Sequence, residues 1–290
     1  MTFAGSSPQR ALRRRNAPGA FKRACMTRIL RGGFFALVVA FGVFAGLRAV
    51  WAAPARNYET TAVTVRIGSH TRTFSLAALQ QMPKVTLPNV QLIGTDKGPQ
   101  GEHTWSGASL REVVLGVDPG FCGSANRGRR LRVTSQDGWA AYIKWVELCG
   151  VPTGGEALFN IKSCNECHGI DGEGAPKDAV RAGPMLKGRS LDPAAVLARL
   201  RSGRAQHGYI IPYAPDQLAE ADLQQILDWL AGKDAAVGAY TVPENRRMTL
   251  LAFEEDGQPM TGRDGLIQMV VGMDDYVNRF AHWVSDIDAE

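Results

Sequence analysis

Apolar and polar residues alternate in short runs over residues 60–145, with the two-residue period of strands buried on one face. Val63, Val65 and Ile67, for example, alternate with polar residues. Asp137-Gly138 separates two such runs and is typical of a hairpin turn. The predicted strands cover residues 62–67, 72–74, 84–92, 131–134 and 139–145. Short helices are expected at residues 76–81 and 110–115, and a polar, Gly-rich loop at residues 94–101.

The pattern becomes helical between residues 152 and 245. Thr153 is expected to cap a first helix, and Asp192-Pro193 is an N-cap and N1 pair that opens a second helix, to Arg201. A last helix covers residues 223–230 and ends before Gly232. Apolar runs typical of strands then return at residues 250–253, 264–271 and 280–287. Two β-rich segments therefore flank a helical one.

The helical segment contains Cys164-Asn165-Glu166-Cys167-His168, the C-x-x-C-H spacing of covalent c-type haem attachment. Two thiols three positions apart on one helical turn can both reach the vinyl groups of a single porphyrin, and the next imidazole can bind the iron. A zinc site would need a second ligand pair at similar spacing, which the sequence lacks. With Gly155, Phe159 and Gly183-Pro184-Met185-Leu186 around the motif, this stretch resembles the class I cytochrome c family.

The resemblance implies a role for each motif residue. Cys164 and Cys167 would covalently hold one haem c, and His168 would be the proximal iron ligand. Pro184 matches the family proline whose carbonyl accepts the N–H of that imidazole, which fixes the ring. Trp229 sits where the family commonly has an aromatic residue packed against the first helix.

The sequence departs from the family at the sixth iron ligand. The family places a methionine before a proline in the loop that precedes the last helix, and here that position is Ile211, which has no lone pair. Tyr209 and Tyr213 are poor donors as neutral phenols, and Met185 adjoins the proximal Pro184. We therefore predict His207 as the distal ligand, because imidazole is a strong iron donor. A five-coordinate or water-ligated iron beside an exposed His207 is the alternative.

The β-rich segments carry a second resemblance. Phe74-x-Leu76, Trp105-Ser106-Gly107-x-x-Leu110 and Val133-x-x-x-Asp137-Gly138-Trp139 look like the molybdopterin-binding fold of sulfite-oxidase-type proteins. The similarity stops near Leu148 and resumes after Asn245. It implies an α+β chain in which a β-rich sulfite-oxidase-like domain, residues 53–151 plus 246–290, is interrupted by an all-α cytochrome c domain, residues 152–245. Three consecutive domains are the alternative, but about 45 C-terminal residues are marginal for a core of their own.

The same resemblance argues against a molybdenum site. Sulfite-oxidase-type enzymes bind the metal through a cysteine before the Trp-x-Gly motif, and residues 88–105 contain none. Cys122 lies beyond the following helix. We therefore expect no molybdopterin, and we interpret His70, His103 and His282 as surface or structural histidines.

Charge and hydropathy separate the N-terminal segment from the rest. The chain has a formal net charge of +5, but residues 1–52 hold nine Lys and Arg and no Asp or Glu, so the remainder is acidic. That balance argues against a nucleic-acid partner. The apolar run at residues 34–47 is short for a bilayer span and is followed by Val50-Trp51-Ala52, which predicts a signal peptide over residues 1–52 and a periplasmic protein. Met26 makes a better start than Met1, and an uncleaved membrane anchor is the alternative.

The remaining cysteines, Cys122 and Cys149, predict a disulfide in an oxidising compartment, with two buried thiols as the alternative. We expect a periplasmic cytochrome that exchanges single electrons with a redox partner protein, rather than a self-sufficient enzyme, with the β-rich domain as a docking scaffold. The alternatives are a molybdenum oxidoreductase with an internal haem, and a haem protein that binds or senses a ligand.

Overall fold

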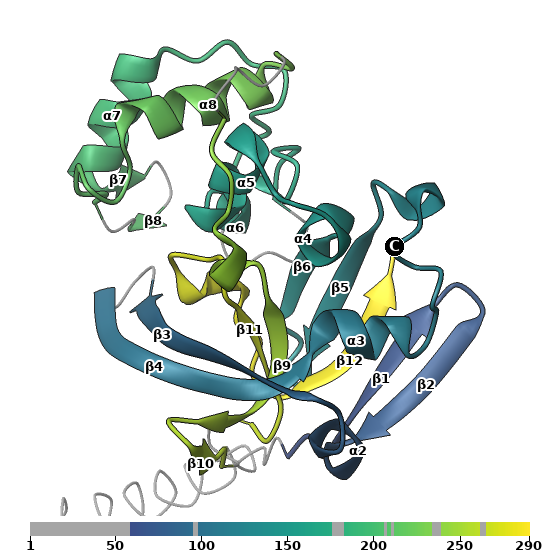
Figure 1. Ribbon diagram of the computed structural model, residues 1–290. Helices are drawn as coiled ribbons and strands as arrows, with labels where there is room; N and C mark the ends of the chain where they lie inside the picture. The colour runs from purple at the N-terminus through teal and green to yellow at the C-terminus, as the bar shows by residue number, and fades with distance from the viewer. Residues whose placement is uncertain are drawn as a thin grey trace, which may run out of the picture. The chain divides into compact units, whose positions relative to one another are not determined.

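The strands of the fold form two main sheets, and the fold is α+β (Figure 1). The computed structural model describes residues 59–94, 98–175, 183–205, 208–209, 212–233, 239–261 and 265–290. Within these ranges no helix has both the length and the apolar character that a membrane crossing requires.

The first sheet joins the two ends of the described chain. Its strand order is β2-β1-β12-β5-β6, so the last strand lies in the middle (Figure 1). β12 pairs in parallel with β1, where Val65 is opposite Ile287, and antiparallel with β5, where Val133 is opposite Ile287. The strands are β1 (Ala62–Ile67), β2 (His70–Ser75), β5 (Arg130–Ser135), β6 (Ala140–Lys144) and β12 (Val284–Ala289).

The second sheet also combines early and late strands. Its order is β10-β9-β4-β3, and β11 pairs with β9 on the other side of β9 from β4. β3 extends two residues beyond its predicted end, and β4 was not predicted as a strand. Gly94 and residues 98–101, which were expected in a loop, are therefore strand. The strands are β3 (Lys84–Gly94), β4 (Gly98–Ser109), β9 (Thr249–Glu255), β10 (Gln258–Pro259) and β11 (Gln268–Val271).

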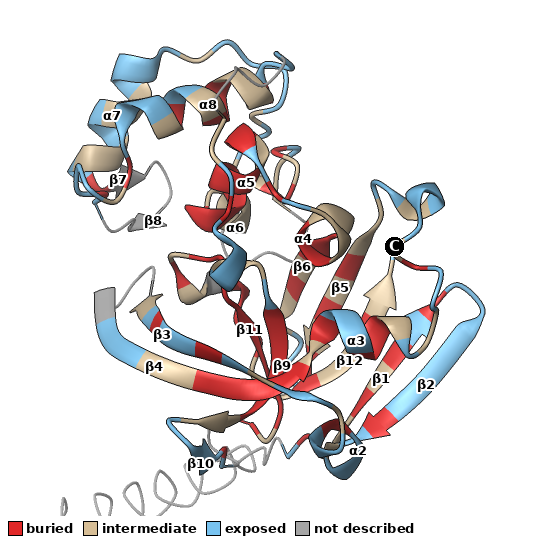
Figure 2. Ribbon diagram, in the orientation of Figure 1, coloured by how far each residue is buried: buried red, intermediate tan, exposed pale blue. Residues whose placement is uncertain are grey.

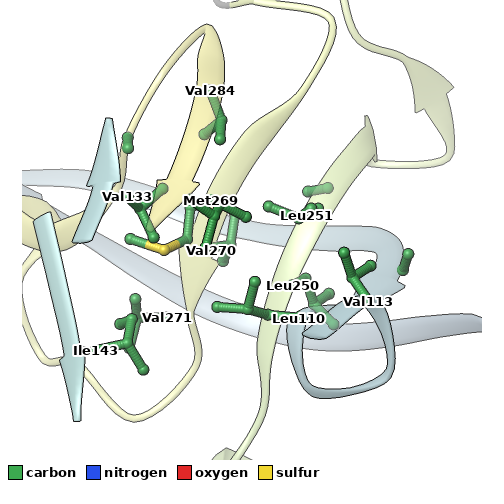
Figure 3. Close-up of a cluster of buried hydrophobic side chains, with 14 of the residues drawn as sticks. Leu110, Val113, Val133, Ile143, Leu250, Leu251, Met269, Val270, Val271 and Val284 are labelled. Carbon is green, nitrogen blue, oxygen red and sulfur yellow. The ribbon is translucent and has the colours of Figure 1, made fainter. Parts of the chain in front are cut away.

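One apolar core lies between these sheets and the short helices. Every residue of β11 is buried, and β9 is buried over its first five residues (Figure 2). Figure 3 shows Leu110 and Val113 of α3 (Leu110–Leu115) together with side chains of both sheets. The sheet residues labelled there are Val133, Ile143, Leu250, Leu251, Met269, Val270, Val271 and Val284. Residues before position 149 and after position 247 therefore share one core.

The short helices largely follow the sequence. Ser75 caps α2 (Leu76–Gln80) as predicted, accepting from the Ala78 N–H at 3.1 Å. α4 (Trp145–Cys149) ends at Cys149, whose disulfide to Cys122 confirms the predicted bridge. The remaining short turns are η1 (Ser124–Asn126), η2 (Glu244–Arg246) and η3 (Val277–Arg279).

The segment between α4 and η2 is mainly helical. Its elements are α5 (Gly154–Ile161), α6 (Asn165–His168), α7 (Pro193–Ser202), β7 (Arg204–Ala205), β8 (Gly208–Tyr209) and α8 (Glu220–Leu230). The two-residue strands β7 and β8 pair with each other, so the segment is not purely α-helical as predicted. Asp192 caps α7 as expected, but the Thr153 side chain makes no capping hydrogen bond to α5.

α5 packs on both sides. Ala157 and Ile161 belong to the core of the sheets, whereas Leu158 and Phe159 belong to a second cluster with α8 and Tyr276. The helical segment is therefore in close contact with the sheets, and its predicted limits at residues 152 and 245 stay a prediction.

The two chain segments that connect the helices to the sheets lie together. Thr153 and Thr241 form an isolated antiparallel bridge. The Val242 N–H donates to the Pro152 carbonyl at 3.1 Å, and the Gly154 N–H donates to the Tyr240 carbonyl at 2.6 Å. The helical segment therefore leaves and rejoins the sheets at one place.

Candidate functional site

The C-x-x-C-H motif consists of α6 and its N-cap residue, directly after the turn that follows α5. Ser163 has a φ of 61°, a left-handed conformation that ends α5 and reverses the chain. Cys164 is the N-cap residue of α6, and Cys167 and His168 are its last two residues. The His168 N–H donates to the Cys164 carbonyl at 3.1 Å, so these three residues lie on one turn. This spacing presents both thiols and the imidazole to one ligand.

The imidazole of His168 is held by a backbone carbonyl. Its Nδ1 lies 2.8 Å from the Pro184 carbonyl oxygen, which can only accept, so Nδ1 carries the proton and Nε2 keeps its lone pair. Burial lowers the pKa of His168, and the nearby Arg189 charge lowers it further, against the opposing effect of the Pro184 hydrogen bond. A neutral imidazole with Nε2 available is the form that binds a metal.

The loop that carries Pro184 lies directly against α6. The Gly183 N–H donates to the Cys167 carbonyl at 2.6 Å, and the Gly174 N–H donates to the His168 carbonyl at 2.7 Å. A Cβ at Gly183 would lie 2.5 Å from the Cys167 carbonyl oxygen and 2.7 Å from His168 Nδ1. Glycine is therefore required where this loop meets the motif.

The first and last helices of the segment cross closely. A Cβ at Gly155 would lie 2.0 Å from the Gln225 carbonyl oxygen of α8, so only glycine permits this approach. Next to the crossing, the rings of Phe159 and Trp229 are 5.1 Å apart between centroids. The predicted packing of Trp229 against the first helix is confirmed.

The thiol of Cys164 is in an apolar setting. Burial raises the pKa of Cys164 to about 12, and the charge of Cys167 contributes in the same direction. A thiol in this environment stays protonated at neutral pH. Neither Cys164 nor Cys167 is disulfide-bonded, which thioether formation requires.

Two tyrosines lie beside the motif. The Tyr213 hydroxyl donates a hydrogen bond to the Lys162 carbonyl, and burial raises the pKa of Tyr213 well above its usual value, so its phenol stays neutral. Its ring contacts that of Tyr276 at 5.4 Å, in a T-shaped arrangement. The buried Tyr276 hydroxyl has no hydrogen-bond partner among the described residues. Sequence reasoning missed Tyr276, because the chain carries it more than 100 positions after the motif.

His207 and Ile211 lie outside the described residues, so the prediction for His207 stays open. Met185, which we did not expect at the iron, is 51% exposed next to Pro184. The residues that are described fit a covalently attached haem: two thiols, a neutral imidazole oriented through Nδ1, and an unpartnered buried hydroxyl.

One other group has metal-ligand character within the described ranges. Ligand-type atoms of His103, Glu255 and Asp256 lie within 4.8 Å of one another. His103 Nδ1 is 2.9 Å from a carboxylate oxygen of each acid, and Asp256 also accepts from the Thr104 N–H at 2.8 Å. These contacts hold His103 between two carboxylates, in agreement with a structural role for His103.

A cavity of about 50 Å³ lies between α4 and α5, lined by residues that include Lys144, Glu147, Glu156 and Asn160. Its volume is too small for a haem or a pterin but is large enough for water. The buried Asn160 Oδ1 has no partner among the described residues.

Comparison with known families gives a match in this part of the chain. Residues 150–230, less than a third of the sequence, match the model described as cytochrome C oxidase, cbb3-type, subunit III. The match supports a cytochrome c domain here, and with it a haem c cofactor and an electron-transfer role. No curated protein matches the chain.

Proposed function

We propose that this chain is a c-type cytochrome that carries single electrons to or from a redox partner protein. The observation that carries the proposal is the 2.8 Å contact between His168 Nδ1 and the Pro184 carbonyl oxygen, directly after the C-x-x-C spacing. A chance histidine beside two cysteines would not need an orienting acceptor. Here the acceptor comes from a loop that two glycines bring against the motif.

Each residue of the motif has a distinct task in this proposal. Cys164 and Cys167 would hold the haem covalently, and the Nε2 of His168 would be an iron ligand. The Pro184 carbonyl keeps the imidazole in the tautomer that can bind, and raises its basicity. A bound haem would supply a one-electron redox couple, so no proton or substrate has to be handled by these side chains.

We propose further that residues 53–151 and 246–290 form a sulfite-oxidase-type domain into which residues 152–245 are inserted. The pairing of β12 with β1 and β5, and of β9 with β4, supports this arrangement. The contact between Thr153 and Thr241 supports it too, because insertions are tolerated where the inserted ends lie close together.

The domain is proposed to act as a docking scaffold without molybdopterin. Residues 88–105 contain no cysteine, and Cys122 is bonded to Cys149, so its thiolate is not available to a metal. The disulfide and covalent haem attachment also suit the periplasm, after export directed by residues 1–52. An uncleaved N-terminal segment would instead anchor the protein to a membrane.

The proposal is tested on full-length protein produced in a bacterium that attaches haem c. We expect one covalently bound haem, measured as the mass increase of the intact chain, with one iron and no molybdenum per chain. The Cys164→Ala/Cys167→Ala variant should lose the added mass. A wild-type chain without covalent haem would refute the proposal. Molybdenum in stoichiometric amount would favour the oxidoreductase, and carbon monoxide binding by the reduced protein would favour the ligand-binding haem protein.

A further inference from the structure

Lys144 is the last residue of β6, and its side chain contacts three parts of the helical segment. Its Nζ is 2.5 Å from Glu156 Oε1 of α5, and it also pairs with Asp171, three positions after His168. The same Nζ lies 5.3 Å from the centre of the Trp229 ring of α8. One cation of the first sheet therefore joins the first helix, the loop after the motif and the last helix.

The three charged groups differ in their contact with solvent. The Lys144 side chain is 10% exposed, whereas those of Glu156 and Asp171 are 37% and 38% exposed. A buried cation is poorly screened by water and salt, so its field reaches its neighbours more strongly than that of a surface lysine. The carboxylates keep enough solvent to stay ionised if the cation is removed.

Together the three groups carry one net negative charge, because a single cation faces two carboxylates. The oxidised form of an iron centre carries one more positive charge than the reduced form. A nearby negative charge therefore favours the oxidised form and lowers the reduction potential, and a nearby cation raises it. Buried charges around a haem are among the means by which a protein sets that potential.

We propose that Lys144 of the sheet raises the reduction potential of the haem held at the C-x-x-C-H motif, by offsetting the charges of Glu156 and Asp171. Lys144 acts through the electric field of its ammonium group and is not a ligand of the iron, so we class it as a positioning residue and not a catalytic one. The inference rests on the proposed haem attachment and adds a role for the sheet: the β-rich part tunes the redox centre that it carries.

The test compares four variants of the full-length, haem-loaded protein by spectroelectrochemical titration. Lys144→Met replaces the cation by an unbranched apolar side chain one atom shorter and leaves two unopposed carboxylates, so the midpoint potential should fall. Glu156→Gln and Asp171→Asn each remove one negative charge, so the potential should rise. The double variant Lys144→Met/Glu156→Gln restores the original net charge, and its potential should return close to that of the wild type.

This design separates charge from packing. Damage to the structure would shift the single variants in the same direction, and combining two damaging changes would not restore the potential; either result would overturn the proposal. Lys144→Arg keeps the charge, and Arg66→Met changes an exposed ion pair in β1, so neither should shift the potential. If Lys144→Met fails to hold haem, a lack of any rise in Glu156→Gln and Asp171→Asn is enough to reject the inference. A wild-type chain without covalent haem would instead refute the proposed function.

Discussion

Lys162 Nζ donates to Asp275 Oδ2 at 2.7 Å, although the two residues are 113 positions apart. Lys162 is the C-cap residue of α5, two positions before Cys164, and Asp275 lies between β11 and η3. Asp275 also accepts from Arg246 at 2.9 Å. A carboxylate from the segment after β11 therefore holds the residue two positions before the cysteine motif, and its loss should lower the stability of the fold.

The first prediction concerns this ion pair. Asp275→Asn leaves the Lys162 ammonium, 11% exposed, without its anionic partner. We expect the free energy of unfolding, measured by chemical denaturation, to fall by about 1–3 kcal/mol. Asp286→Asn is the matched control, because its partner Arg66 is 45% exposed and such surface pairs contribute less than about 1 kcal/mol. Equal effects of the two substitutions would contradict the prediction.

The second prediction concerns a buried cluster of charges. Arg279 donates to both Glu147 and Asp274, and all three side chains are at most 3% exposed. Burial raises the pKa of Asp274 to about 6, aided by the charge of Glu147 and opposed by Arg279.

In the unfolded chain the pKa of an aspartate is about 3.9, so between pH 4 and 6 the folded state holds more protons than the unfolded state. The stability contributed by the protonated form is therefore lost as the pH rises through this window, by up to about 3 kcal/mol. The free energy of unfolding is measured for wild-type and Asp274→Asn protein at pH 4 and pH 7. The wild type should lose stability between these two pH values, and the substitution should remove the part of that loss that Asp274 causes. If both proteins lose the same amount, Asp274 is not the source.

The third prediction concerns the disulfide. The Cys122–Cys149 bridge spans 27 positions, for which loop-closure entropy suggests about 3.5 kcal/mol of stabilisation. Cys122→Ser/Cys149→Ser should lower the free energy of unfolding by about 2–5 kcal/mol. Alkylation of denatured wild-type protein without reductant should leave both residues unlabelled, and labelling of both would refute the bridge.

The fourth prediction concerns His207, which the structure does not describe. If its imidazole is the sixth iron ligand, His207→Ala should convert the ferric haem from low spin to high spin in the absorption spectrum. His70→Ala, at the exposed start of β2, serves as the control and should leave the spectrum unchanged. The same low-spin spectrum in His207→Ala would eliminate this ligand.

The fifth prediction concerns the insertion. Replacing residues 152–245 by a short Gly-Ser bridge should leave a soluble β-rich protein, because Thr153 and Thr241 already lie side by side. Ala157 and Ile161 contribute to the core of the sheets, so the product should be less stable than the intact chain. Circular dichroism and denaturation measure both properties. A product that is unfolded under all conditions would argue against the insertion.

The local features of the fold could be predicted from the sequence. The alternation of apolar and polar residues predicted β1 and the hairpin of β5 and β6, because one face of each of these strands is buried. A short apolar run predicted β9, whose first five residues are all buried. The Asp192-Pro193 pair located the start of α7. The last two residues of β3 and the whole of β4 were not predicted as strand. The polar, Gly-rich residues at the start of β4 resemble a loop and are held as strand by their pairing with β3.

Only those residues of the candidate site that lie close together in the sequence could be predicted. The thiols, His168 and the Pro184 carbonyl lie within 21 residues of one another, and their spacing indicates their chemistry. Lys144 at the end of β6 and Tyr276 at the start of η3 reach the same region, and no local pattern connects them to the motif. Their proximity follows from packing between distant segments, which a single sequence does not reveal.

The order of the first sheet also sets the order in which the protein can be completed during synthesis. β12 lies between β1 and β5, yet the ribosome makes it after all the other strands. Until residue 289 has emerged, β1 and β5 have no strand between them, and the sheet remains two separate hairpins. The cysteine motif is therefore made before its host sheet can close.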